Sequence, residues 1–178
     1  MKLPPDIKTE RLVIAPFAET DADRFVAFLT DPVATEFVFR DAQKTANGAR
    51  DFLGQIIASY ATDTPYFVYA MRPLEGDGFV GTCGASGLPY EGIFELFCCV
   101  LTAHRRQGYA IEAARALVRY CFDNYAVHEF RAYVNENNPS APGLARRLGM
   151  SPLGPGEHPV YGDKSRVYAL RKGDQALT

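Results

Sequence analysis

Hydrophobic and polar residues alternate along the chain in blocks, and the period of each block predicts the element that it forms. The first block, Glu10–Pro16, has a period of two and predicts a strand. The next block has apolar residues three and four positions apart, which predicts a helix that Asp21 caps and the Asp31–Pro32 step ends. The same spacing predicts a second amphipathic helix over Asn47–Tyr60.

Three strands are predicted in the middle of the chain, at Tyr66–Met71, Phe79–Leu88 and Phe94–Leu101. Glycine-containing turn sequences separate them, at Glu75–Gly78 and Pro89–Gly92. Because strands joined by short turns pair with their neighbours, these three are expected to form an antiparallel part of one sheet.

The C-terminal part alternates helices with strands. A helix is predicted from Gly108 to about Tyr125, followed by a strand at Glu129–Val134. A short helix over Ala141–Leu148 ends at Gly149, a typical C-cap residue, and the last strand is Ser165–Leu170. The order β-α-α-β-β-β-α-β-α-β predicts an α/β fold of the α+β type, a mixed, mostly antiparallel sheet flanked by helices. The middle β-α-β unit supplies the parallel pair.

The composition is that of a soluble globular protein. The 178 residues are 47% hydrophobic and 22% charged, which excludes disordered, coiled-coil and collagen-like chains and suits a single domain over residues 1–178. Nineteen basic residues nearly balance 21 acidic ones, so no dedicated nucleic-acid or membrane surface is expected. No apolar run approaches the ~20 residues that span a bilayer.

Cysteine and histidine positions give no sign of a metal site. The chain has four cysteines, none at zinc-finger or C-x-x-C spacing, and three scattered histidines. The first six residues are too polar and too rich in proline for a secretory signal. Free thiols without an export signal indicate a reducing compartment, so the cytoplasm is the expected location.

The segment with the clearest chemistry joins the strand ending at Leu101 to the following helix. A helix start leaves backbone N–H groups unpaired and carries partial positive charge, which makes it an anion site. Gly108 lets a phosphate approach the backbone, and two arginines add charge. The segment does not match the dinucleotide or P-loop nucleotide motifs. Its residues are Arg105, Arg106, Gln107, Gly108, Tyr109 and Ala110.

This segment resembles the R/Q-x-x-G-x-G/A loop of the GNAT superfamily of N-acetyltransferases, with Arg105, Gly108 and Ala110 at the three defining positions. Three further matches extend the resemblance to about Thr9–Leu170 and indicate the RimJ/RimL-like branch. They are Thr9-Glu10-Arg11-Leu12 in the first strand, Gly81 after Phe79-Val80, and Asn138 followed by Leu148-Gly149-Met150.

The resemblance implies that acetyl-CoA is the cosubstrate and that its acetyl group moves directly to an amine, with no covalent enzyme intermediate and no metal. It implies backbone hydrogen bonds from Cys98, Val100 and Leu101 to the pantetheine arm, phosphate binding by the 105–110 loop, and a cofactor contact from Asn138. A backbone N–H near Cys99 or Val100 could polarise the thioester oxygen.

Two residues are candidates for the catalytic chemistry. Glu95 shares the cofactor-binding strand with apolar neighbours and is the leading candidate for the base that accepts the amine proton. Counting back from Gly149 places the serine common in the family at Ala141, and Ser140, one position earlier, is the second candidate. Plain structural roles remain open for both Glu95, as a solvated or ion-paired strand residue, and Asn138, as a helix cap.

Two functions are compatible with these features. The first is an N-acetyltransferase acting on a protein N-terminus or a small amine, as a monomer or homodimer. The second is a catalytically silent CoA-binding domain with a sensing or interaction role, favoured by Ala145 where many members have a tyrosine acid and by Ala141. Phe37 and Phe39, in a loop-like stretch, are candidates for lining an acceptor pocket.

Overall fold

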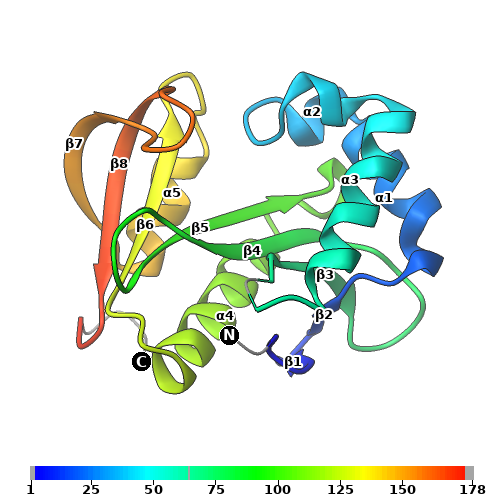
Figure 1. Cartoon of the computed structure of the whole chain (residues 1–178), viewed down its shortest axis with the longest axis horizontal. Helices are drawn as coiled ribbons and strands as arrows, with labels where there is room; N and C mark the ends of the chain where they lie inside the picture. The colour runs from blue at the N-terminus through cyan, green and yellow to red at the C-terminus, as the bar shows by residue number, and fades with distance from the viewer. Residues whose placement is uncertain (1–2, 64, 175–178) are drawn as a thin grey trace.

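The computed structural model describes residues 3–63 and 65–174, which form an eight-stranded sheet with helices on both faces (Figure 1). The strands are β1 (Ile7–Lys8), β2 (Leu12–Pro16), β3 (Phe67–Pro73), β4 (Gly81–Gly87), β5 (Ile93–Val100), β6 (Glu129–Asn135), β7 (Ser151–Glu157) and β8 (Lys164–Arg171). The α-helices are α1 (Ala22–Leu29), α2 (Pro32–Thr35), α3 (Ala46–Ser59), α4 (Tyr109–Asn124) and α5 (Ala141–Leu148). Short 3-10 turns are η1 (Glu19–Asp21), η2 (Asp41–Lys44) and η3 (Thr102–His104).

The strand order is β1-β2-β3-β4-β5-β6-β8-β7, and every neighbouring pair is antiparallel except β5 and β6. This confirms the predicted mixed, mostly antiparallel sheet and its parallel pair around α4. The parallel ladder is short, because only Ile93–Glu95 pairs with Glu129–Arg131 before the two strands diverge. Figure 1 shows β6, β8 and β7 on one side of this divergence and β2–β4 on the other.

The sequence pattern missed β1, α2 and β7. The strand β7 has the sequence SPLGPGE, in which prolines and glycines are poor strand formers. It lies at the edge of the sheet and its ladder is irregular between Pro152 and Gly154, and both features accommodate prolines that cannot donate to a ladder. The strand predicted at Phe79–Leu88 is shorter in the structure, Gly81–Gly87.

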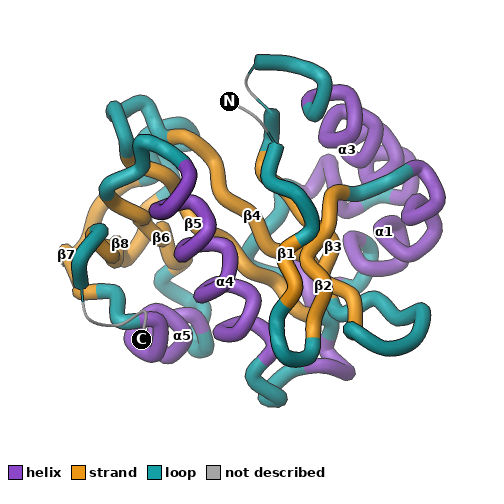
Figure 2. The backbone as a smooth tube through the Cα atoms, turned by 90° about the horizontal axis from the view of Figure 1, so that it is seen from below, coloured by secondary structure: helices purple, strands orange, loops and turns teal. Residues whose placement is uncertain are grey.

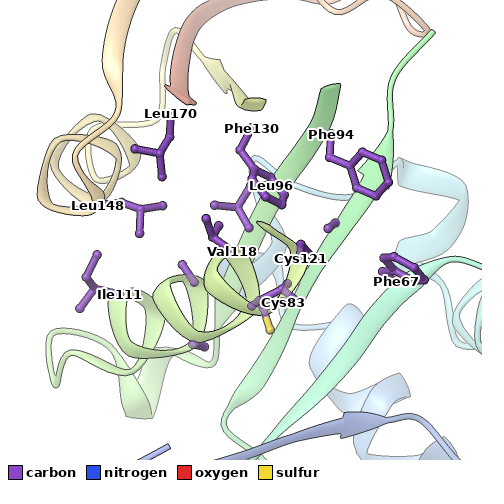
Figure 3. Packing of buried hydrophobic residues seen from close by; sticks show 14 of the residues in the cluster. Phe67, Cys83, Phe94, Leu96, Ile111, Val118, Cys121, Phe130, Leu148 and Leu170 are labelled. Carbon is purple, nitrogen blue, oxygen red and sulfur yellow. The ribbon is translucent and has the colours of Figure 1, made fainter. Parts of the chain in front are cut away.

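Each face of the sheet packs against its own helices. Strand side chains alternate in direction, so β5 contributes Phe94 and Leu96 to the core beneath α4 and α5, and Cys99 to the core beneath α1–α3. Figure 2 shows α4 lying across β4 and β5, with α1 and α3 beyond β3. In Figure 3, Val118 of α4 points toward Leu96 of β5, whereas Ile111 at the start of α4 points toward Leu148 of α5, and all four belong to one core cluster.

Of two helix-capping residues expected from the sequence, Gly149 ends its helix as predicted and Asp21 does not cap its helix with its side chain. Gly149 has φ 87° and ends α5, as its position after Leu148 predicts. Asp21, expected to cap α1, makes no capping bond to that helix. Its carboxylate instead accepts from the N–H of Ala18, the N-cap residue of η1, at 2.8 Å and from Arg72 on β3 at 2.6 Å.

Candidate active site

The site begins where β5 and β6 separate. Along β5 the backbone groups alternate in direction: the Ile93 carbonyl and the Leu101 N–H are bonded on the β4 side, whereas the Gly92 carbonyl accepts on the β6 side. By this alternation the backbone groups of Cys98 and Val100 face the side that β6 has left. They form a strand edge to which an extended ligand could add.

Leu101 and Cys99 are less available than Cys98 and Val100. The N–H of Leu101 donates to Val80 at 2.9 Å and its carbonyl accepts from His104 at 2.9 Å. The backbone of Cys99 faces β4, opposite Thr82. Of the two N–H groups considered for polarising a thioester oxygen, the geometry therefore favours that of Val100.

A cavity of about 980 Å³ opens at this split. Its lining residues come from elements on the β5 side and on the β6 side of the split, which only the folded sheet brings together. Apolar and small lining residues come from β5, α4, β6 and α5, and include Leu96, Cys98, Ala114, Val134 and Ala141, while the polar Asn138 comes from the loop between β6 and α5. Aromatic and charged lining residues come from the segment after α2, from β5 and β6 and from the β7–β8 loop, and include Phe37, Phe39, Glu95, Tyr133, His158 and Tyr161.

Glu95 lies in this cavity at the last residue pair of the β5–β6 ladder, with 20% of its side chain exposed. Its Oε2 is 3.0 Å from Nε2 of His158, a residue on the loop between β7 and β8. Its second oxygen, Oε1, makes no hydrogen bond with the residues that the structure describes. The carboxylate is thus held at one oxygen and free at the other, an arrangement suited to accepting a proton. No pattern in the sequence pointed to His158, a lone histidine 63 positions after Glu95.

The 105–110 loop forms a concave set of backbone donors. Arg106 has φ 60° and Gly108 has φ 88°, both left-handed, and the loop runs directly into α4. Within residues 3–63 and 65–174, no carbonyl or side chain accepts from the N–H groups of residues 106–111. Successive free N–H groups at a helix start bind anions such as phosphate.

The side chains of this loop have several different roles. Arg105 reaches α2, where its guanidinium donates to the carbonyls of Val33 at 2.6 Å and Ala34 at 3.3 Å. Its Nε also donates to the Val100 carbonyl at 3.4 Å, so the guanidinium joins α2 and the end of β5 to the loop. Arg106 is exposed, and Gln107 donates to Ala103 at 3.1 Å. The Ala110 carbonyl accepts from the Cys98 thiol at 3.7 Å, which connects the helix start to the β5 edge.

Glu112 anchors the loop to the first strands. Its carboxylate accepts from the hydroxyl of Thr9 at 2.6 Å, the N–H of Arg11 at 2.9 Å and the Arg11 guanidinium at 2.6 and 2.8 Å. Arg11 in turn donates to the Gln107 carbonyl at 2.9 Å and lies over the Tyr109 ring at 4.7 Å. Burial acts to raise the pKa of Glu112, but these hydrogen bonds and the arginine charge outweigh it and lower the pKa. Thr9 and Arg11 belong to the recognised first-strand motif and Glu112 follows the 105–110 loop by two residues, but their contact is visible only in the fold.

Asn138 and Ser140 lie at the start of α5. The Asn138 Oδ1 accepts from the N–H groups of Ser140 and Ala141 at 3.1 and 3.2 Å and from the Ser140 hydroxyl at 2.9 Å. Asn138 therefore caps the helix while also lining the cavity. Ser140 is exposed and is not among the lining residues, whereas Ala141 is. The Ser140 hydroxyl is directed to Asn138, and the catalytic role expected for this residue stays a prediction.

The cysteine thiols are poor nucleophiles. Burial raises the pKa of Cys99 to about 12 and that of Cys121 to about 12, and it also raises the pKa values of Cys83 and Cys98. Among the described residues, no group of three or more histidine, cysteine or acidic side chains could hold a metal ion. No described helix is long and apolar enough to cross a membrane.

Comparisons with known proteins give the family. The Acetyltransferase (GNAT) domain matches residues 11–151. An N-acetyltransferase of Bacillus licheniformis, the uncharacterized protein p20, is 28% identical over 134 residues, which cover 74% of this chain and 75% of that protein. A GNAT-family acetyltransferase from Bacillus anthracis has the same fold, with a TM-score of 0.78, 20% identity and coverage of 93% of this chain and 98% of that one.

RimJ from Mycobacterium smegmatis, whose structure was solved in complex with CoA-disulfide, also shares the fold. The TM-score is 0.75 at 13% identity, over 92% of this chain and 83% of that one. At 20% and 13% identity, these two solved structures show a shared fold. The chain belongs to the GNAT family of acetyltransferases, acyltransferases that use acetyl-CoA.

Proposed function

We propose that this protein transfers the acetyl group of acetyl-CoA directly to a primary amine, either a protein N-terminus or a small amine, with Glu95 as the general base. One observation supports this most: Glu95 places a half-free carboxylate in a cavity that also contains the open edge of β5. A base and a cosubstrate site in one cavity are what direct transfer requires.

The residues present fit acetyl-CoA. The free N–H groups of residues 106–111 match a pyrophosphate, and the backbone groups of Cys98 together with the N–H of Val100 match an extended pantetheine arm. When bound, acetyl-CoA supplies the acetyl group as a thioester, whose C–S bond breaks as the C–N bond to the amine forms. The Val100 N–H would then stabilise the negative charge that develops on the thioester oxygen.

Glu95 would complete the proton transfer. An amine attacks only through its free electron pair, so an ammonium loses two protons in all: one before attack, and one from the nitrogen once the C–N bond has formed. Oε1 of Glu95 is the carboxylate oxygen without a partner among the described residues, and it would take one of these protons directly or through one water. The departing sulfur would take up the other of the two protons that the nitrogen loses and leave as the CoA thiol. Ala145, buried at the cavity wall, supplies no side-chain acid for this second transfer.

The cavity lining is consistent with an amine that carries an apolar group. Phe37 and Phe39 lie on the wall contributed by the segment after α2, and Glu95 provides negative charge that attracts an ammonium group. Both kinds of acceptor in the proposal, a peptide N-terminus and a small amine, present these features.

The test is acetyl transfer from labelled acetyl-CoA to a panel of peptide N-termini and small amines, compared between the wild type and Glu95→Gln. Glutamine keeps the shape of the side chain but cannot accept the proton, so turnover at pH 7 should fall by about 10²–10⁴-fold. The deficit should shrink at high pH, where free amine is abundant, and acetyl-CoA affinity should stay near the wild-type value.

A matched control is Glu157→Gln, an exposed glutamate at the end of β7 that is not among the cavity-lining residues. Its turnover should equal that of the wild type. Transfer to no member of the panel by the wild type would contradict the proposed acceptors, and wild-type turnover in Glu95→Gln at saturating acceptor would show that the base lies elsewhere.

A further inference from the structure

The loop between β7 and β8 brings one buried histidine against Glu95. The side chain of His158 is 7% exposed. It stacks on the Tyr161 ring at 4.5 Å with an interplanar angle of 28°, and the Tyr133 ring lies 4.8 Å away at 54°. Two aromatic rings therefore fix the plane of the imidazole, which leaves its two nitrogens pointing in defined directions.

The hydrogen bonds of His158 determine where its ring proton lies. Nδ1 accepts from the backbone N–H groups of Val160 at 3.1 Å and Tyr161 at 3.2 Å. A nitrogen that faces two N–H donors cannot carry a proton of its own, so the proton of the neutral ring lies on Nε2. Nε2 is the atom 3.0 Å from Oε2 of Glu95, and it therefore donates to the carboxylate.

The loop itself is held closed by its backbone. The N–H of His158 donates to the Asp163 carbonyl at 2.9 Å, and the His158 carbonyl accepts from the Gly162 N–H at 2.7 Å. All four polar groups of His158, two in the backbone and two in the ring, are thus in use. The ring is positioned by the loop before any substrate arrives, which is the usual requirement for a group that orients another side chain.

The same loop contacts the opposite wall of the cavity. Arg40, which precedes η2, lies over the Tyr161 ring at 4.1 Å and forms an ion pair with Asp163 at 3.1 Å. Glu95 lies on β5, where the ladder to β6 ends, so its bond to His158 connects β5 with the β7–β8 hairpin. The β7–β8 loop, which supplies the hydrogen bond to Glu95, is therefore attached both to β5 and to the segment around Arg40.

We propose that His158 is a positioning residue for Glu95: its Nε2–H holds Oε2 so that Oε1 faces the acceptor amine. The inference rests on the proposed function, in which Glu95 is the base. His158 does not take the amine proton itself, because Nδ1 already faces two donors and Nε2 already carries a proton. Its contribution is to confine the carboxylate to one orientation, which matters because small displacements of a reacting group reduce turnover strongly.

Two substitutions separate the contacts of His158. In His158→Gln the amide N–H lies near the place of Nε2 and can donate to Glu95. In His158→Asn the amide oxygen lies near the place of Nδ1 and can accept from Val160 and Tyr161, but the side chain is too short to reach Glu95. We expect kcat to fall by about 10–100-fold in His158→Asn and to stay within about threefold of the wild type in His158→Gln. The KM for acetyl-CoA should not change in either variant. Equal loss in both variants would overturn the proposal.

A double-mutant cycle separates this inference from the proposed function. In the Glu95→Gln background, His158→Asn should cause little further loss, because a positioning residue acts only through its partner. If Glu95→Gln lowers turnover but His158→Asn does not, the role of His158 is wrong and the base assignment stands. If Glu95→Gln has wild-type turnover, the base assignment itself is wrong.

The ring proton can be observed in the wild-type protein without any activity assay. The chain has three histidines, so two-bond ¹H–¹⁵N correlation spectra contain few imidazole signals, and the set missing in His158→Asn belongs to His158. We expect the pattern of a ring protonated on Nε2 and unprotonated on Nδ1 at neutral pH. A proton on Nδ1 would overturn the proposal, whatever the variants do.

Discussion

Replacing Glu112 with glutamine would remove the charge that joins the first strands to the start of α4. In the wild type the carboxylate accepts from Thr9, from the Arg11 backbone and from the Arg11 guanidinium, all within 2.9 Å. Glutamine can keep one acceptor oxygen for Thr9 and the Arg11 N–H. Its amide nitrogen would then face the guanidinium, donor against donor, so the ionic contact is lost.

The size of the effect follows from the burial of the pair. Hydrogen bonds to charged groups contribute about 1.5–3 kcal/mol, and the Glu112 side chain is only 16% exposed. Arg11 is 43% exposed, so water screens part of the attraction and the lower end applies. We therefore expect Glu112→Gln to lower the free energy of unfolding by about 1–2 kcal/mol. For a domain of this size the melting temperature should fall by roughly 2–8 °C.

The chain offers a matched control. Arg24 and Asp77 form an ion pair of similar geometry, with contacts of 2.9 and 2.7 Å, but Asp77 is 86% exposed. Asp77→Asn should leave stability unchanged within error, because exposed pairs are screened and contribute little. The assay is urea unfolding followed by circular dichroism. Equal losses for Glu112→Gln and Asp77→Asn would refute the burial argument.

The pH dependence gives a second check on Glu112. Its pKa in the folded protein lies below the usual value, so its contribution to stability is complete above the unfolded value of about 4.3 and is lost as pH falls through the folded value. The difference in unfolding free energy between the wild type and Glu112→Gln should therefore be constant near pH 7 and narrow below about pH 4. If this difference in unfolding free energy persists at the lowest pH at which both proteins are still folded, the lowered pKa of Glu112 is contradicted.

Two further predictions concern the loop and the thiols. Gly108 has φ 88°, which a β-branched residue adopts only under strain, while a Cβ there would approach only the end of the Arg11 side chain at 3.2 Å. Gly108→Val should thus abolish tight acetyl-CoA binding measured by calorimetry, with a native circular dichroism spectrum; unchanged affinity would exclude the loop as the phosphate site. In the wild type, acetyl-CoA at ~100 times its Kd should add ~2.7 kcal/mol of stability, and the variant should lose this gain. Burial raises the pKa of all four thiols, so native protein at pH 8 should react slowly with a disulfide reagent and all four should react after denaturation; one fast native thiol would disagree.

The sequence alone determined the features that depend on neighbours along the chain. The period of apolar residues located α3, α4 and α5 and most of the strands, since a buried face imposes its spacing on each element. Gly108 and Gly149 marked helix ends because only a residue without a Cβ takes a left-handed conformation at low cost. The 105–110 loop could be recognised from consecutive residues for the same reason.

Only the tertiary structure decided which distant side chains meet. Glu95 and His158 are 63 positions apart, and Glu112 lies more than 100 from Thr9 and Arg11. Their contacts depend on the order of strands in the sheet and on how soon β5 and β6 diverge, and neither follows from local propensity. The same holds for β7, whose prolines are acceptable only because it lies at the sheet edge. Local patterns in the sequence fix what each segment becomes, whereas the functional groups are brought together by long-range packing that no single segment encodes.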